Sequence, residues 1–185
     1  MRLFVAVNLP DDVRRALWEA AEPVRRPNPP VRWVEPNAVH FTLKFLGDVE
    51  AGREPAVRQA IDAAVAGARR FPLRIDGFGV FPNASRPRVI WAGCEAAPQL
   101  EVLQHRVEQE MERLGFPIEG RPFQPHVTLG RARDGAPGDR MAAVAAAVER
   151  LQFAADVTVM SVDLMESQLS PTGARYSRRH AAVLG

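Results

Sequence analysis

The sequence contains no long hydrophobic run and almost no cysteine. No stretch approaches 18 consecutive apolar residues, which excludes a membrane-spanning helix. Cys94 is the only cysteine, so an internal disulfide cannot form. The first ten residues become polar too soon for the apolar core of a secretory signal. We therefore expect a cytoplasmic protein that does not associate with membranes.

Lysine is nearly absent as well. Lys44 is the one lysine among 24 basic residues, and all the others are arginines. The net charge is only +2, yet the isoelectric point is about 9.3. A planar guanidinium matches phosphate oxygens, so an arginine-rich basic protein favours a polyanionic partner. A gene rich in G and C also favours arginine and alanine codons, and composition alone does not separate the two explanations.

Length and hydrophobic patterning predict one globular domain. The chain has 185 residues, of which 46% are apolar and 25% charged, as in ordinary soluble domains. Apolar residues recur at helical spacing in four segments, and short apolar or alternating runs indicate strands. The expected helices cover 11–24, 57–68, 100–114 (closed by Gly115) and 139–150 (capped by Asp139). The expected strands cover 3–9, 39–46, 71–81, 87–93, 125–131, 153–168 and 176–184.

The order of these elements indicates an α+β fold with internal repetition. Hairpins among the strands argue against a doubly wound parallel sheet. Divided near residue 97, the chain gives two halves with a similar series of elements. We predict a single domain over residues 1–185, with two lobes related by a pseudo-two-fold axis. Antiparallel or mixed sheets would line a central cleft, with helices outside.

One four-residue pattern occurs in the central strand of each half. Residues 40–43 read His-Phe-Thr-Leu, and residues 126–129 read His-Val-Thr-Leu. The whole chain has only four histidines, so two matches by chance are rare. Side chains alternate along a strand, which predicts one face with His40, Thr42 and Lys44 and the other with Val39, Phe41, Leu43 and Phe45.

The second copy repeats this arrangement with His126 and Thr128. If the halves pack around a two-fold axis, two imidazoles and two hydroxyls converge in one cleft. A single His-x-Thr is commonly only a satisfied polar pair. Two matched copies instead indicate an acid and a base positioned for catalysis.

The residues around the two motifs narrow the chemistry. No carboxylate, cysteine or third histidine lies at metal-ligand spacing, and no Gly-x-Ser-x-Gly nucleophile motif occurs. Two histidines without a metal suit in-line displacement at phosphorus. A neutral imidazole takes a proton from the attacking hydroxyl, and an imidazolium gives one to the leaving oxygen. The threonine hydroxyls can donate hydrogen bonds to the non-bridging oxygens. We therefore expect neither a metal nor a cofactor.

The two motifs resemble those of the two-histidine (2H) phosphoesterase superfamily. Further segments look like the bacterial and archaeal RNA 2′,3′-cyclic phosphodiesterases, also called 2′–5′ RNA ligases: residues 2–6, Trp33 with 40–47, 86–91 and 166–176. The resemblance runs over nearly the whole chain. It implies hydrolysis of a terminal RNA 2′,3′-cyclic phosphate, or of a cyclic nucleotide, to a 2′-phosphomonoester. It also implies 2′–5′ RNA ligation without ATP, and we expect a monomer.

The resemblance also assigns roles to single residues. It implies that His40 is the general acid, that His126 is the general base, and that Thr42 and Thr128 hold the phosphate. The family often has a basic residue five positions after the second histidine, where this chain has Arg131. Strict alternation turns Arg131 away from the histidine face, so its contribution requires a β-bulge or the end of the strand.

Two other functions remain open at this stage. The chain could be another 2H phosphoesterase, acting on 2′–5′ oligoadenylate or on a small cyclic nucleotide. It could also be an RNA- or nucleotide-binding module without catalysis, although the two intact motifs argue against that.

The remaining candidate residues have ordinary structural explanations. We expect His105 on a solvated helix face and His180 on the surface or on an edge strand. Lys44 could attract phosphate or be a solvated charge. Three aromatic residues could stack on a base, although core packing is the commoner use: Trp33, Phe123 and Tyr176.

Overall fold

Nine strands form one antiparallel sheet in the computed structural model, which describes residues 1–171 and 173–185. Their order is β7-β4-β5-β6-β3-β1-β8-β9, and the short β2 also pairs with β6. Thr172, in the segment that carries part of the family resemblance, lies outside the described residues. The strands are β1 (Arg2–Asn8), β2 (Val31–Trp33), β3 (His40–Asp48), β4 (Phe71–Phe81), β5 (Val89–Cys94), β6 (Val127–Ala132), β7 (Ala154–Val159), β8 (Ser161–Ser170) and β9 (Gly173–Val183).

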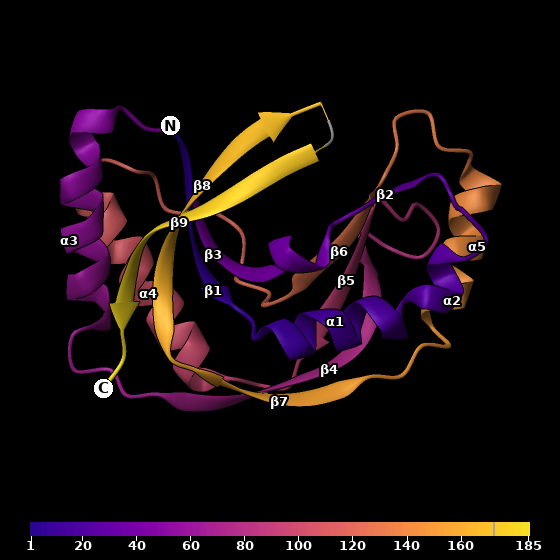
Figure 1. Ribbon diagram of the computed structural model, residues 1–185, viewed down its shortest axis with the longest axis horizontal. Coiled ribbons are helices and arrows are strands. Elements are labelled where there is room, and N and C mark those ends of the chain that lie inside the picture. The colour runs from indigo at the N-terminus through magenta and orange to yellow at the C-terminus, as the bar shows by residue number, and fades with distance from the viewer. Residues whose placement is uncertain (172) are drawn as a thin grey trace.

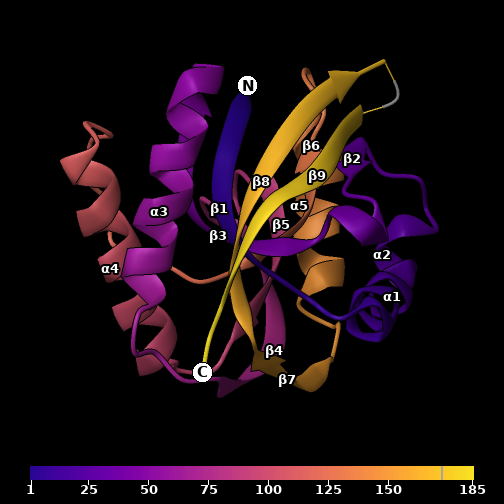
Figure 2. The same cartoon turned by 60° about the vertical axis from the view of Figure 1, so that its left-hand side comes forward.

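The helices lie in two groups at opposite ends of the sheet (Figure 1). One group contains α3 and α4, which pack against each other, and the other contains α1, α2 and α5. Figure 2 shows the same separation after rotation. The α+β prediction is therefore confirmed. The helices are α1 (Asp11–Ala20), α2 (Glu22–Arg25), α3 (Glu54–Val65), α4 (Pro98–Arg113) and α5 (Gly138–Val148), with short 3₁₀ turns η1 (Pro36–Ala38) and η2 (Ala51–Arg53).

Each lobe draws strands from both halves of the sequence. The first lobe contains β3, β1, β8 and β9 with α3 and α4. The second contains β6, β5, β4, β7 and β2, with α5 packed on β4. The two lobes meet where β3 pairs with β6, which are the strands that carry the two motifs. The boundary near residue 97 thus divides the sequence but not the sheet, and the internal duplication stays a prediction.

Helix α4 illustrates how the apolar pattern determines the packing. Its predicted stripe is buried, with Leu100 and Met111 completely inaccessible. Gly115 follows the helix with a φ of +85°, a conformation that costs glycine little. The Phe116 N–H then donates to the Met111 carbonyl at 3.0 Å. Gly115 therefore ends the helix as predicted.

Three predicted boundaries are wrong for identifiable reasons. The helix expected over 11–24 is two helices, because Pro23 has no N–H to continue the first. The strand expected over 153–168 breaks at Met160, where the chain leaves its partner β4 and begins to pair with β1 and β9. Asp139 lies in the first turn of α5 and is not its cap, since Pro137 precedes the helix.

The described residues include no helix that is long and apolar enough to cross a membrane.

Candidate functional site

The two motif strands meet at one residue pair. Phe41 of β3 lies opposite Val127 of β6, and both are completely buried. Residues next to a buried strand position point to the other face. The four histidine and threonine side chains therefore surround this contact on the face away from the core. We call this the site face; it carries His40, Thr42, His126 and Thr128.

A β-bulge interrupts the alternation of β3 directly after its motif. Thr42 pairs with Ala6 of β1, but Lys44 pairs with the preceding residue, Val5, so Leu43 is an extra residue. A bulge of this kind moves the side chains that follow it to the opposite face. Leu43 is buried as predicted, but the predicted faces of Lys44 and Phe45 are wrong.

Lys44 and Phe45 exchange their expected environments as a result. Lys44 is buried, not on the site face, and its Nζ lies 2.5 Å from Glu108 Oε2 of α4. The same ammonium donates to the Pro117 carbonyl at 2.8 Å. Phe45 is 69% exposed and lies beside Phe4, its partner on β1. Lys44 is thus neither a phosphate ligand nor a solvated charge.

The second motif has a bulge at the equivalent position. Thr128 pairs with Trp91 of β5, whereas Gly130 pairs with Ile90, which leaves Leu129 as the extra residue. Gly130 now points inward, where a Cβ atom would lie 2.7 Å from Val31 Cγ1. Only glycine fits there.

The same bulge moves Arg131 onto the site face. Arg131 pairs with Val89, which lies two residues from Trp91 on β5 and therefore shares its face with Thr128. The sequence analysis required a β-bulge, or the end of the strand, for Arg131 to reach the histidine face, and the structure has that bulge. The contact of Arg131 with phosphate stays a prediction.

Both histidines are held in the same way. His40 Nδ1 lies 2.7 Å from the Ala38 carbonyl, and His126 Nδ1 lies 2.7 Å from the Gln124 carbonyl. A carbonyl can only accept a hydrogen bond, so Nδ1 carries the hydrogen in each ring. Each Nε2 is therefore the nitrogen that can exchange a proton with a substrate. In His40 it accepts from the Thr42 hydroxyl at 2.9 Å.

Aromatic rings pack against both imidazoles. His40 lies 4.8 Å from the ring of Phe4 and 5.4 Å from that of Tyr176. His126 meets Phe81 edge to face at 5.0 Å, and Phe81 lies 5.0 Å from Trp91. These rings fix the orientation of the imidazoles and reduce their contact with water.

Burial strongly affects the protonation of His40. Desolvation lowers the pKa of its imidazole to about 4, although the Ala38 carbonyl opposes the shift. Repulsion by Arg14 and by His126 lowers this pKa further, so the two histidines are close enough to interact. His40 is therefore neutral at pH 7 until a negative charge reaches the site.

A polar network behind His40 contains the arginine that repels it. Asn8 is the cross-strand partner of His40 on β1. Its Oδ1 accepts from Arg14 at 3.0 Å, and its Nδ2 donates to Asp163 Oδ2 at 2.7 Å. Asp163 is buried and also accepts from Ser161 Oγ at 2.8 Å.

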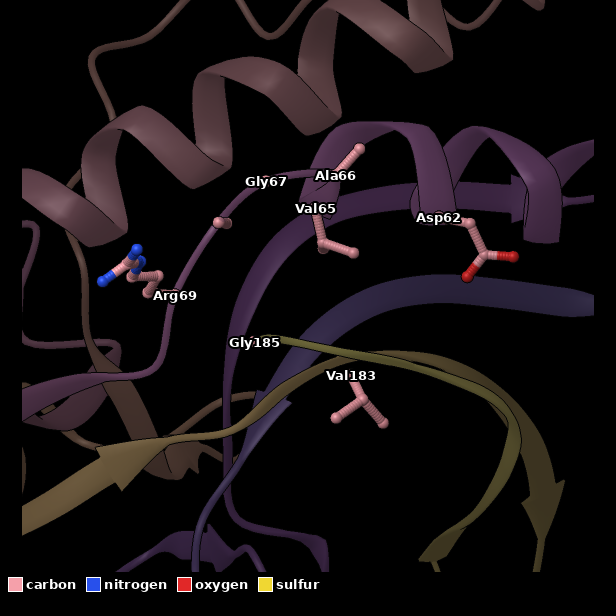
Figure 3. A pocket seen from close by; sticks show the side chains of 8 residues that line it. Asp62, Val65, Ala66, Gly67, Arg69, Val183 and Gly185 are labelled. Carbon is pink, nitrogen blue, oxygen red and sulfur yellow. The ribbon is translucent and has the colours of Figure 1, made fainter.

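The other two histidines lie elsewhere. His105 is exposed on α4, as expected. His180 lies on the edge strand β9, as expected, and donates from Nε2 to Asp62 at 2.7 Å. Asp62 also lines a surface hollow between the end of α3 and the end of β9 (Figure 3), and no histidine lines this hollow.

Across residues 1–171 and 173–185, no three His, Cys, Asp or Glu side chains are grouped as a metal ion requires.

The three aromatic residues pack against buried apolar clusters, as expected. Trp33 and Phe123 pack against the main core, as expected. Tyr176 packs against a small second cluster on the site face, which contains Phe4 and Met165. Sequence reasoning missed the rings and polar groups beside the histidines: Phe4, Phe81, Trp91, Asn8, Arg14 and Asp163. The only signal for them is cross-strand register, which a single sequence does not reveal.

Comparisons with known proteins identify the family of this chain. The family model of the 2′-5′ RNA ligase superfamily matches residues 10–170. A Methanothermobacter thermautotrophicus protein named RNA 2′,3′-cyclic phosphodiesterase is 32% identical over 177 residues, covering 96% of this chain and 95% of its own. A Thermus thermophilus protein of the same name is 36% identical over 185 residues, covering 96% and 87%.

Solved structures give the same result. TT0787 of Thermus thermophilus superposes with a TM-score of 0.83 at 33% identity, over 100% of this chain and 98% of that one. Escherichia coli LigT, solved with 3′-AMP, has a TM-score of 0.79 at 27% identity, over 99% and 97%. This chain belongs to the 2′-5′ RNA ligase superfamily.

Proposed function

We propose that this protein hydrolyses the terminal 2′,3′-cyclic phosphate of RNA and leaves a 2′-phosphomonoester. One observation carries the proposal: two His-x-Thr strands meet at the Phe41–Val127 pair, with both imidazoles anchored through Nδ1. The relatives named RNA 2′,3′-cyclic phosphodiesterase support this substrate class. The LigT structures, solved with 3′-AMP and with phosphate, support a nucleotide phosphate as the ligand.

The reaction requires one base and one acid. His126 Nε2 takes a proton from water as the water oxygen bonds to phosphorus. The bond from phosphorus to the 3′ oxygen breaks, and His40 Nε2 gives its proton to that oxygen. The products are a 2′-phosphomonoester and a free 3′ hydroxyl, and proton exchange with solvent restores both histidines. Because His40 is neutral in the free protein, the negative charge of the bound cyclic phosphate must raise the pKa of His40, so that its Nε2 takes a proton from solvent before the reaction.

The threonines and Arg131 stabilise the phosphorane-like transition state in this proposal. Thr42 and Thr128 flank the same strand contact as the histidines, so their hydroxyls can donate to the non-bridging oxygens. Arg131 adds positive charge on the same face. If the 5′ hydroxyl of an RNA replaces water, the same steps give a 2′–5′ linkage without ATP. We also propose that the protein acts as a cytoplasmic monomer and needs no metal.

The test uses EDTA-treated protein and a short RNA that ends in a 2′,3′-cyclic phosphate. We expect full turnover, and ³¹P NMR should identify a 2′-phosphomonoester as the product. Loss of turnover in EDTA, or a 3′-phosphomonoester product, would contradict the mechanism. Cleavage of 2′–5′ oligoadenylate but not of the cyclic end would support the other 2H activity. Binding without turnover would indicate a binding module.

A further inference from the structure

Two arginines face each other across adjacent strands at one end of the site face. Arg32 of β2 is the direct partner of Arg131 on β6, and both side chains are exposed. Like charges opposite each other on a sheet repel. Among the described residues neither guanidinium group has a hydrogen-bonded or ion-paired partner, and Glu35 and Asp134, close by in sequence, do not pair with them. The pair thus presents two positive charges to solvent that no carboxylate of the described residues neutralises.

The register places this pair on the same face as the second motif. Cross-strand partners share a face, so Arg32 lies on the face of Arg131. Arg131 shares its face with Val89, Trp91 and Thr128 because of the Leu129 bulge. A one-residue change in register would point both guanidinium groups into the core side of the sheet.

The spacing separates Arg32, on the strand beyond Arg131, from the catalytic phosphate. Val89 and Trp91, the partners of Arg131 and Thr128, are two residues apart on β5, which corresponds to about 7 Å along the strand. That distance is comparable with the distance between successive phosphates of a single-stranded RNA. Two arginines of the network around Asp163 already have partners: Arg14 donates to Asn8, and Arg178 pairs with Asp163.

We infer that Arg32 binds the phosphate on the 5′ oxygen of the terminal nucleoside, while the cyclic phosphate lies between the histidines on the side of Arg131. This inference rests on the proposed function and adds a substrate requirement. The site recognises the end of a strand, which carries that second phosphate, and not an isolated cyclic nucleoside. The strand leaves the site over β6 and β2.

The experiment compares two substrates that differ by one phosphate. They are adenosine 2′,3′-cyclic phosphate and the same nucleotide with an added 5′-phosphate. We expect kcat/KM of the unchanged protein to be about tenfold higher for the 5′-phosphorylated form, the usual worth of one charge-assisted contact. The variant R32Q should lose this preference and keep its rate on the unphosphorylated form within about twofold. The control R69Q, an exposed arginine after α3, should keep the preference.

Equal rates on both substrates in the unchanged protein would overturn the inference. The inference would also be overturned if R32Q lowered kcat/KM equally on both substrates, or if R69Q lost the preference as R32Q does. If neither substrate is hydrolysed, the proposed function fails instead. Calorimetry with 2′-AMP and adenosine 2′,5′-bisphosphate then tests Arg32 separately. R32Q should weaken the binding of the bisphosphate about tenfold and the binding of 2′-AMP less than twofold. Equal effects on the two affinities would refute the subsite.

Discussion

Phosphate binding should raise the pKa of His40 enough to protonate its imidazole at pH 7. In the free protein the pKa of His40 is about 4, mainly because the ring is desolvated. At pH 7 about one molecule in a thousand then has an imidazolium there. The shift from the ordinary value of 6.5 corresponds to roughly 3 kcal/mol against the charged ring. A phosphate charge about 4 Å away contributes about 4 kcal/mol at an effective dielectric constant of 20, which is enough to reverse this preference.

Heteronuclear NMR of the imidazole ¹³C–¹H and ¹⁵N signals measures this directly. We expect His40 to titrate near pH 4 alone and about 2–3 pH units higher with saturating 2′-AMP. The variant R14M should raise the pKa of His40 in the free protein, since Arg14 repels the proton. R15M, a change at the exposed neighbour, is the matched control. A His40 that titrates near 6.5 alone, or whose pKa does not rise with 2′-AMP, would refute the reasoning.

Three further outcomes follow from the side chains around the site and the core. Thr42→Ala and Thr128→Ala should each lower kcat by roughly 10-fold to 10³-fold, as for one lost oxyanion donor, in steady-state assays at pH 7. Lys44→Met should destabilise the fold by about 3–5 kcal/mol in urea unfolding, because it leaves Glu108 charged and buried; the double change with Glu108→Leu should recover most of this loss. Glu54 is held by Arg179 and Arg58, which lower its pKa from 4.5 to about 2, so its stabilisation is present above pH 4.5 and lost as the pH falls toward 2. Glu54→Gln should therefore cost on the order of 1–2 kcal/mol at pH 7 and almost nothing at pH 2, and an equal cost at both would contradict the ion-pair assignment.

The sequence was sufficient for the elements whose pattern is local. The stripe of α4 and the turn at Gly115 follow from spacing and backbone preference alone, and both appear in the structure. The repeated His-x-Thr pattern predicted two similar strands, and these strands are the ones that meet at the centre of the sheet. A repeat in the sequence constrains long-range packing in a way that a single motif does not.

Register was what the sequence could not provide. Leu43 and Leu129 look like ordinary alternating residues, yet each is the extra residue of a bulge, and this reverses the faces of Lys44 and Arg131. The partners that decide these positions come from distant segments: Glu108 of α4 holds Lys44, and Val31 packs where Gly130 leaves room. For the same reason the sequence did not predict that Asn8 and Tyr176 lie beside His40.

The most direct test of the account is the rate of the two histidine variants on a cyclic-phosphate-ended RNA. His40→Ala and His126→Ala should each lower kcat by roughly 10²–10⁴, the usual worth of a positioned acid or base. The double variant should lose little more than the weaker single variant, because the two groups act in one step. His105→Ala, at the exposed position on α4, should keep full activity. Full activity at pH 7 in either His40→Ala or His126→Ala would contradict the account.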